Sequence, residues 1–137
     1  MAVLGPEGGI ARDLATEGFG IFDEVGATST IFIGEEPKEP DSLVAVLVDV
    51  GGRFPSTVSE EWLITVRVRD PDYETALTQM RDIAVYLQEK GQGDFGGIKI
   101  GRLAPESTPV TLGRDENRRW RVEQVFSALM KRSFSFS

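Results

Sequence analysis

The stretch WLITVRVRDPDYETALTQMRDIAVYLQEK, residues 62–90, decides the fold of this protein. Apolar and polar side chains alternate from Trp62 to Arg69, which predicts a strand with one apolar face and one face that becomes cationic toward its end. The sequence Asp-Pro-Asp at 70–72 follows at once. It predicts a helix start, because Asp70 can cap free backbone N–H groups and proline suits the first helical position.

After this start the period changes to that of a helix. Apolar residues form one stripe at helical spacing: Tyr73, Ala76, Leu77, Met80, Ile83, Ala84 and Leu87. The stripe predicts an amphipathic helix that runs to about Glu89, where Lys90 and Gly91 close it. We therefore expect one face of the sheet to pack on helices and the other to meet solvent or a partner.

Shorter patterns on both sides predict the remaining elements. Toward the N-terminus they are a helix at Ile10–Glu17, which Gly8 and Gly9 keep from starting earlier, a strand at Thr30–Ile33, an irregular loop to Asp41, a strand at Leu43–Val50 and a loop at Arg53–Ser59. Toward the C-terminus they are strand residues at Ile98–Ile100 and Leu103, a strand at Pro109–Leu112, a turn at Gly113–Asn117 and a long strand at Arg119–Met130.

This order of elements predicts an α+β domain, with a mostly antiparallel sheet of about five to six strands and two helices packed on one face. Gln124 interrupts the apolar face of the last strand once, which indicates a sheet edge or an interface. We expect one domain over residues 1–137, with flexible ends at 1–9 and 133–137.

The composition excludes several kinds of chemistry. The 137 residues contain no cysteine and no histidine. Disulfides, thiolate nucleophiles, zinc fingers and iron–sulfur clusters are thereby excluded, and the usual general base near neutral pH is missing. Catalysis would have to rely on carboxylates, Ser/Thr, Lys or oxygen-ligated metal ions. We expect no catalytic set, no cofactor and no metal site.

The charge balance bears on partners. The chain carries 15 basic and 22 acidic residues, a net charge of −7, which disfavours binding to nucleic acid or to anionic membranes. The apolar runs are too short to span a bilayer, and the start of the chain lacks the features of a signal peptide. We therefore expect a cytoplasmic chain.

The charge is unevenly spread along the sequence. Residues 1–61 have a net charge of −9 and residues 62–137 a net charge of +2, with an acidic extreme at 35–41 and a basic extreme at 114–121. Two interpretations stay open. Both stretches are solvated loops, or the acidic face of one subunit meets the basic face of the next, a head-to-tail contact that can close a ring.

Two patterns suggest ligand sites and are weak. Residues 91–96 match G-x-G-x-x-G, but they follow a helix and precede a strand, the reverse of a dinucleotide site. The acidic side chains at 35–41 could bind Ca²⁺, yet their spacing is not that of an EF-hand. A solvated acidic loop is the favoured interpretation.

Three phrases, in one order, resemble the tail terminator and minor capsid protein family of tailed phages. They are Ile31–Asp41 followed by Val46–Gly52, Val66–Arg69 followed by Asp72–Ala76, and Leu112–Trp120. The similarity extends from about Ile10 to Arg132. Arg118 departs from the pattern, because a glycine is often expected there, so the hairpin turn is expected to differ in shape.

The resemblance implies a non-enzymatic virion protein of a tailed phage or prophage, with an α+β fold. Such proteins form a hexameric ring on the head-proximal end of the tail tube, stop its polymerisation and offer a docking surface to the head. The implied partners are further copies of the chain, the tail tube protein and head–tail connector proteins. Genomic DNA passes through without sequence-specific binding, no membrane is involved, and assembly occurs in the host cytoplasm.

Under this hypothesis we assign two sets of residues. Subunit contacts are expected at Trp62, Arg67, Arg69, Arg114, Arg118, Arg119, Trp120 and Arg121. Pore-lining or docking-loop positions are expected at Glu35, Glu36, Glu39, Asp41 and Arg53. Aromatic and Arg side chains suit the first set because they dominate interface energetics, and acidic side chains suit a channel along which DNA slides by like-charge repulsion.

Two alternatives remain. The first is another neck component, such as a head-completion or adaptor protein, which would also form a ring. The second is a small enzyme or binding domain that uses carboxylates, which predicts a monomer or dimer with a concave pocket of convergent polar groups.

Overall fold

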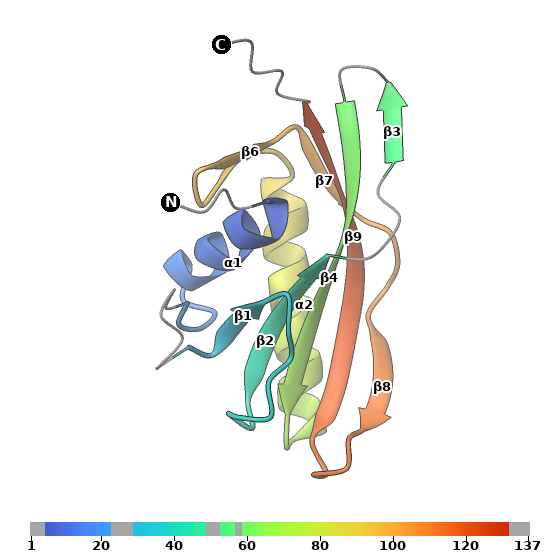
Figure 1. Ribbon diagram of the computed structural model, residues 1–137. Helices are drawn as coiled ribbons and strands as arrows, with labels where there is room; N and C mark the ends of the chain where they lie inside the picture. The colour runs from blue at the N-terminus through green and yellow to red at the C-terminus, as the bar shows by residue number, and fades with distance from the viewer. Residues whose placement is uncertain (1–4, 23–28, 49–52, 57–58, 132–137) are drawn as a thin grey trace.

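The computed structural model describes residues 5–22, 29–48, 53–56 and 59–131. Its elements are α1 (Pro6–Thr16), β1 (Ile31–Ile33), β2 (Leu43–Val48), β3 (Arg53–Ser56), β4 (Ser59–Asp70), α2 (Tyr73–Lys90), β5 (Gly93–Phe95), β6 (Ile98–Ile100), β7 (Arg102–Pro105), β8 (Val110–Arg114) and β9 (Trp120–Lys131). The α+β class predicted from the sequence is confirmed (Figure 1).

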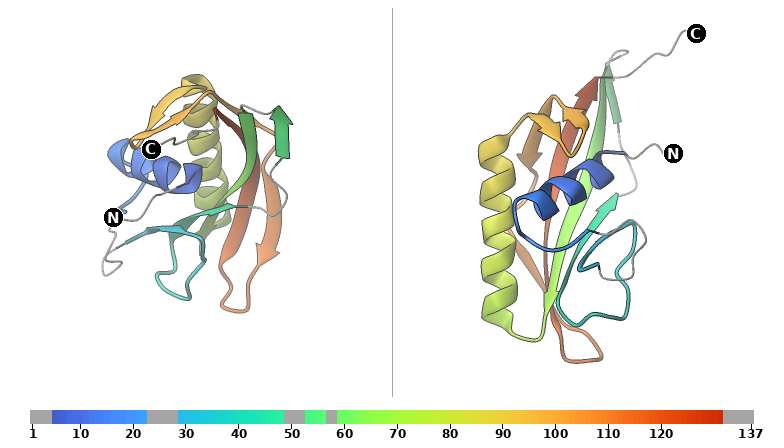
Figure 2. Two further views of the ribbon diagram at one scale, coloured as in Figure 1. Left: turned by 45° about the horizontal axis from the view of Figure 1, so that its top comes forward. Right: turned by 90° about the vertical axis from the view of Figure 1, so that its left-hand side faces the viewer.

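One twisted sheet forms the body of the molecule. Within the described residues it has seven strands, ordered β1-β2-β4-β9-β7, with β3 beside β4 and β8 beside β9. The β1–β2 pair is parallel and the other pairs are antiparallel, so the sheet is mostly antiparallel as predicted. The short β5–β6 hairpin is separate and lies near α1 (Figure 2).

The two longest strands form the centre of the sheet. β4 and β9 pair over their whole length, from Ser59 opposite Lys131 to Asp70 opposite Trp120. Because side chains alternate along a strand, the even-numbered residues Ile64, Val66 and Val68 of β4 share one face. All three are fully buried.

Both helices pack on that face, as predicted (Figure 2). α1 contributes Ile10, Ala11 and Leu14 to one core, and α2 contributes Ala76, Met80, Ile83 and Leu87. The apolar stripe of α2 therefore packs against the sheet, as its helical spacing predicted. The opposite face of the sheet carries the odd-numbered residues of β4, including Arg67 and Arg69.

The first helix starts earlier than predicted. Pro6 occupies its first turn, a position in which proline suits a helix, so residues 6–9 are helical rather than a flexible end. Gly8 and Gly9 are buried. A Cβ added to Gly9 would collide with the carbonyl oxygen of Phe95, so glycine here lets α1 approach the β5–β6 hairpin instead of ending the helix.

Other boundaries also differ from the prediction. Part of the expected loop at 53–59 is β3, which pairs with the extension of β4 beyond β2. Pro55 is compatible with this strand because β3 is an edge strand. The expected strand end at 49–50, and the expected flexible end at 133–137, lie outside the described residues.

The helix cap is Asp72 rather than Asp70. The carboxylate of Asp72 accepts hydrogen bonds from the backbone N–H and the hydroxyl of Thr75, at 3.0 and 2.7 Å, and the hydroxyl bond leads in lowering the pKa of Asp72 below its ordinary value. Asp70 instead accepts a bond from the Asp72 N–H at 2.8 Å. Pro71 therefore lies in the turn before the cap.

In the described part of the chain, neither helix is long and apolar enough to cross a lipid bilayer.

Candidate functional site

The face of the sheet opposite the helices is charged and partly covered. Residues 34–42, which we call the acidic loop, connect β1 to β2. Arg69 of β4 contacts this loop: its Nη2 donates to the carbonyl oxygens of Pro40 at 2.6 Å and Lys38 at 3.2 Å, and its Nε donates to that of Asp41 at 3.4 Å. Only 3% of Arg69 is exposed, so its cation stabilises the backbone of the loop.

A second arginine supports the same loop from the β8–β9 hairpin. Arg119 Nη1 donates to the carbonyl oxygen of Lys38 and lies 3.4 Å from Asp41 Oδ1, while its Nε donates to Asp115 at 2.9 Å. Burial raises the pKa of the Asp115 carboxyl, but the backbone N–H groups and the guanidinium that bind it outweigh this and hold that pKa below its ordinary value. Arg119 is thereby buried and oriented by an acid four residues away.

Glu36 turns from the acidic loop onto the sheet. Its two carboxylate oxygens lie 3.6 Å from Arg67 Nη1 and 3.4 Å from Arg121 Nη1. Arg67 also donates to Glu123, its partner across the β4–β9 pair, at 2.6 and 2.9 Å. These four side chains form one network of alternating charge over the two central strands.

The acidic and basic stretches of the sequence therefore meet within one subunit. Of the residues predicted to contact other subunits, Arg67, Arg69, Arg119 and Arg121 have partners in the acidic loop of their own chain. Burial, followed by the nearby charge of Arg119, lowers the pKa of Arg69. The subunit-contact assignment stays a prediction, and these internal contacts restrict what a partner can reach.

The two tryptophans also have partners in their own chain. Both are half-buried and pack against the core. Trp62 Nε1 donates to Glu60 at 3.0 Å. The centre of the Trp120 ring lies 5.0 Å from that of Tyr73, edge to face, and 5.5 Å from the guanidinium carbon of Arg114. Trp120 thus joins the β8–β9 hairpin to the start of α2.

Among the predicted site residues whose side chains are described, exposed charges lie at two places. Glu35 and Glu39 lie exposed on the acidic loop, and the side chain of Asp41 is 65% exposed. Arg114 and Arg118 lie exposed on the hairpin. For Arg53, the side chain lies outside the described residues.

Arg118 shows how the hairpin turn accommodates a residue other than glycine. Its φ is +61°, the left-handed conformation that glycine adopts without cost. The side chain of Asp115 accepts from the N–H groups of Asn117 and Arg119, both at 2.9 Å, which holds the turn. The backbone at 118 therefore has a glycine-like conformation.

A buried polar cluster on the helix side was not predicted from the sequence. Asp13 of α1 accepts hydrogen bonds from the Tyr86 hydroxyl at 2.5 Å and from Lys90 Nζ at 2.8 Å. Lys90 Nζ also lies 4.4 Å from the centre of the Phe95 ring. The only local signal was that Tyr86 and Lys90 are four residues apart on one helix, and nothing local indicated Asp13 as their partner.

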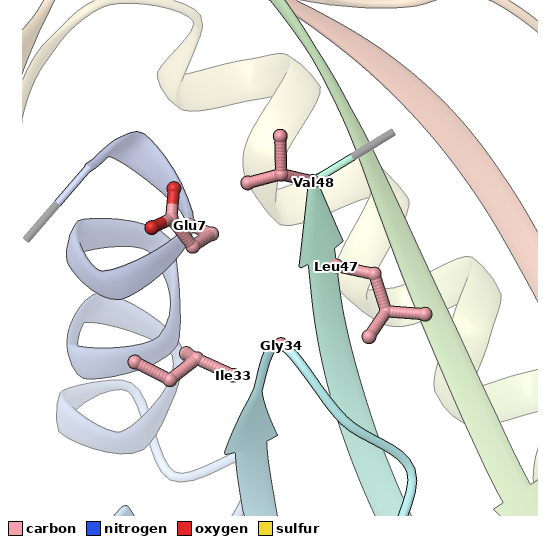
Figure 3. A pocket seen from close by; sticks show the side chains of 5 residues that line it. All are labelled: Glu7, Ile33, Gly34, Leu47 and Val48. Atoms are coloured by element: carbon pink, nitrogen blue, oxygen red, sulfur yellow. The ribbon is translucent and has the colours of Figure 1, made fainter. Parts of the chain in front are cut away.

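The structure contains shallow hollows. One is bordered by Glu7, Ile33, Gly34, Leu47 and Val48, between the start of α1 and the ends of β1 and β2 (Figure 3). Glu7 is its single carboxylate, and its Oε2 is buried without a hydrogen-bond partner among the described residues. These residues hold no nucleophile beside a base.

The acidic side chains do not converge on a metal site. Among the described residues, no group of three or more of them is placed to hold a metal ion. In particular, Glu36 of the acidic loop faces two arginines, so it does not converge with its acidic neighbours.

The fold is thus a small sheet with two helices on one face and a charged loop over part of the other. Residues 14–128 match the bacteriophage tail terminator protein family. This match covers more than half of the chain, so the protein belongs to that family and is a structural protein of the phage tail or neck. The resemblance seen in the sequence is confirmed.

A solved structure and a curated relative complete the comparison. The fold is similar to that of a chain in the virion of a native gene transfer agent particle, with a TM-score of 0.52 and 15% identity over 79% of this chain and 81% of that one. An alanine–tRNA ligase of Chelativorans sp. (strain BNC1) is 30% identical over 132 residues. That match covers 85% of this chain and 14% of the ligase, so the chain spans only a small part of the ligase's length.

Proposed function

We propose that the protein caps the head-proximal end of a phage tail tube as a homohexameric ring. The ring terminates tail polymerisation and provides the interface for head–tail joining. The observation that carries this proposal is the family match over residues 14–128. The fold similarity to a chain of a virion particle supports the same setting.

The charged surfaces suit different parts of this role. The exposed acids Glu35 and Glu39 are the pore-lining or docking candidates, because the charge of Glu36 is already compensated within the chain. An acidic lumen would repel the phosphates of the DNA and so let it slide. The exposed Arg114 and Arg118 are the cations of the hairpin that a neighbouring subunit or the tube can reach.

The decisive experiment adds the purified protein to polymerising tail tube protein and measures tube lengths by negative-stain electron microscopy. We expect shorter tubes with added density at one end, and a solution mass near six times 15.1 kDa for the capping species. Tubes that grow to the same length, with both ends bare, would overturn the proposal. Binding to isolated head connectors without any effect on tubes would assign the adaptor role instead.

A matched pair of variants tests the lumen. Glu35→Gln with Glu39→Gln should leave ring assembly intact and slow DNA delivery, because it removes exposed negative charge. Glu36→Gln, which changes a charge held inside the subunit, should act on loop stability instead. Assembly and DNA delivery that stay unchanged in the first variant would remove Glu35 and Glu39 from the pore.

A further inference from the structure

A groove on the helix side has no assigned role. It lies between α2 and the connection from β7 to β8, and its volume is about 350 Å³. Its lining is mainly apolar, with Ala84 and Val85 on α2 and Pro105 and Pro109 on the connection. This volume is at the low end of the roughly 300–1,000 Å³ of ligand pockets, and it suits one or two side chains rather than a cofactor.

Val85 is an exposed apolar residue on the solvent-facing side of α2. It is 53% exposed, although neighbours on the outer side of α2, such as Arg81 and Gln88, are polar. An exposed large apolar side chain beside an apolar groove is what a partner's side chain would cover.

Gln124 adds a second, independent observation. It also lines the groove, it is 5% exposed, and its Nε2 donates to the carbonyl oxygen of Ser107 at 2.6 Å. Its Oε1 is buried without a hydrogen-bond partner among the described residues. An unsatisfied buried acceptor is unfavourable, and because solvent does not reach this atom in the free subunit, a donor would reach it, and stabilise the complex, only when the groove opens on binding. The interruption of the apolar strand face thus coincides with the groove, as expected of an interface.

The chain itself contains a segment that suits the groove. Residues 133–137 read Ser-Phe-Ser-Phe-Ser. In an extended conformation, both phenylalanines would point to one side and the serines to the other. Such a segment offers aromatic side chains to an apolar groove and backbone N–H groups to an unpaired acceptor.

A hairpin folded back along β9 would not bring this segment to the groove of its own subunit. β9 ends at Lys131, and even a two-residue reversal at 132–133 would bring Phe136 opposite Leu129. That position is five residues, or about 17 Å, short of Gln124. Moreover, Leu129 is already paired on both sides, with Glu61 and with Arg102.

We propose that residues 133–137 of one copy lie in the α2 groove of the next copy, with Phe134 and Phe136 against Val85 and a backbone N–H donated to Gln124 Oε1. The contact is heterologous, since the segment and the groove are different surfaces, and repetition of such a contact closes a ring. The inference rests on the proposed ring and names the contact that links its subunits.

Cysteine cross-linking tests the contact directly, because the chain has no cysteine of its own. We expect Val85→Cys combined with Phe136→Cys to give a ladder of multimers on a non-reducing gel after mild oxidation. The matched control is Val110→Cys with Phe136→Cys, since Val110 is similarly exposed, at 47%, and lies on β8 rather than on α2. Absence of the ladder, a ladder as strong in the control, or a cross-link within single chains would overturn the inference.

A second pair of variants keeps the test independent of cysteine chemistry. Val85→Asp should abolish the assembled species, whereas Thr78→Asp, at another exposed position of α2, should not. Phe134→Ser with Phe136→Ser should act like Val85→Asp, and Phe→Leu at both positions should restore assembly. Equal masses for Val85→Asp and Thr78→Asp would overturn the contact.

The two proposals can fail separately. All of these measurements are made with and without tail tubes, so a ring that forms only on the tube is still detected. If the variant with cysteines at positions 85 and 136 caps tubes but gives no ladder, the segment exchange is overturned and the capping role remains. If the same variant gives the ladder while wild-type protein leaves the tubes unaffected, the capping role is contradicted instead.

Discussion

Charged side chains hold both α1 and the acidic loop in place, but in different ways. On the helix side, one buried carboxylate, Asp13, binds two side chains of α2. On the other side, two arginines bind mainly backbone carbonyl oxygens of the loop. The first arrangement depends on a single group, whereas the second is shared between Arg69 and Arg119.

The difference indicates how each part of the molecule responds to the loss of one charged group. If Asp13 is lost, two polar groups lose their partner at once. If one arginine is lost, the loop keeps the other. We therefore expect the loss of Asp13 to lower the stability of the protein more than the loss of one of the two arginines.

The largest expected effect is that of Asp13→Ala. Removing one member of a buried ion pair costs up to several kcal/mol, and with Lys90 partly exposed we expect a loss of about 3 kcal/mol in the free energy of unfolding. Urea denaturation measures it. Asp82→Ala, an exposed acid of α2, is the control and should change stability by no more than about 0.5 kcal/mol. Equal effects of the two variants would contradict a special role for Asp13.

Arg69→Leu should have a smaller effect on stability and a clear local effect. It removes the donors for three carbonyl oxygens while Arg119 remains, so we expect a loss of about 2 kcal/mol. We also expect faster tryptic cleavage after Lys38, measured by mass spectrometry under native conditions. Arg114→Leu, which changes an exposed arginine of the hairpin, should leave that cleavage rate unchanged. Identical rates in the two variants would show that Arg69 does not hold the loop.

The contribution of Tyr86 and Asp13 to the stability of the protein should depend on pH. Burial, and then the hydrogen bond to Asp13, raises the pKa of Tyr86 above its ordinary value of 10.0. Above pH 10 the folded state therefore keeps a proton that the unfolded state loses, so this contribution to stability decreases as pH rises.

The corresponding measurement compares the wild type with Tyr86→Phe between pH 8 and 11. We expect the wild type to be the more stable below pH 10, by about 1 kcal/mol for the lost hydrogen bond, and the gap to narrow above it. Tyr73→Phe, which changes an exposed tyrosine, is the control for the loss of a phenolic hydroxyl. A stability difference between the wild type and Tyr86→Phe that widens as pH rises would contradict a raised pKa of Tyr86.

Local sequence patterns predicted the parts of the fold that depend on local period. The change from a period of two to a helical period at 70–72 identified the strand and the helix. It also identified the apolar face on which each packs against the other. The resemblance of three phrases identified the family. Such patterns did not identify β3, because its pairing depends on how far β4 extends beyond β2.

The contacts of the candidate site could not be predicted from the sequence for a similar reason. Glu36 and Arg121 are 85 positions apart, and Tyr86 and Asp13 are 73 apart. Charge polarity along the chain left two interpretations open, solvated loops or a contact between subunits, and neither placed the two stretches against each other within one chain. It could not indicate whether they meet within one subunit or between two, because that depends on where the acidic loop folds.

The smallest expected effect concerns Arg118, on the hairpin beside the loop-binding Arg119. The left-handed conformation costs a residue other than glycine about 1 kcal/mol or more, and the greater freedom of glycine in the unfolded chain offsets part of this. Arg118→Gly should therefore raise the free energy of unfolding by about 0.5 kcal/mol, whereas Gly113→Ala, at φ +85°, should lower it by about 1 kcal/mol.

Strain that persists at an exposed position suggests that the side chain is retained for contact rather than for stability. Arg118→Gly should accordingly give a more stable subunit that assembles less well, measured by urea denaturation and by solution mass across protein concentration. Arg118→Asn, which tolerates the same backbone conformation without the charge, separates the two effects. If it assembles like the wild type, the cation at 118 is not part of the interface and the hairpin serves only to hold the acidic loop.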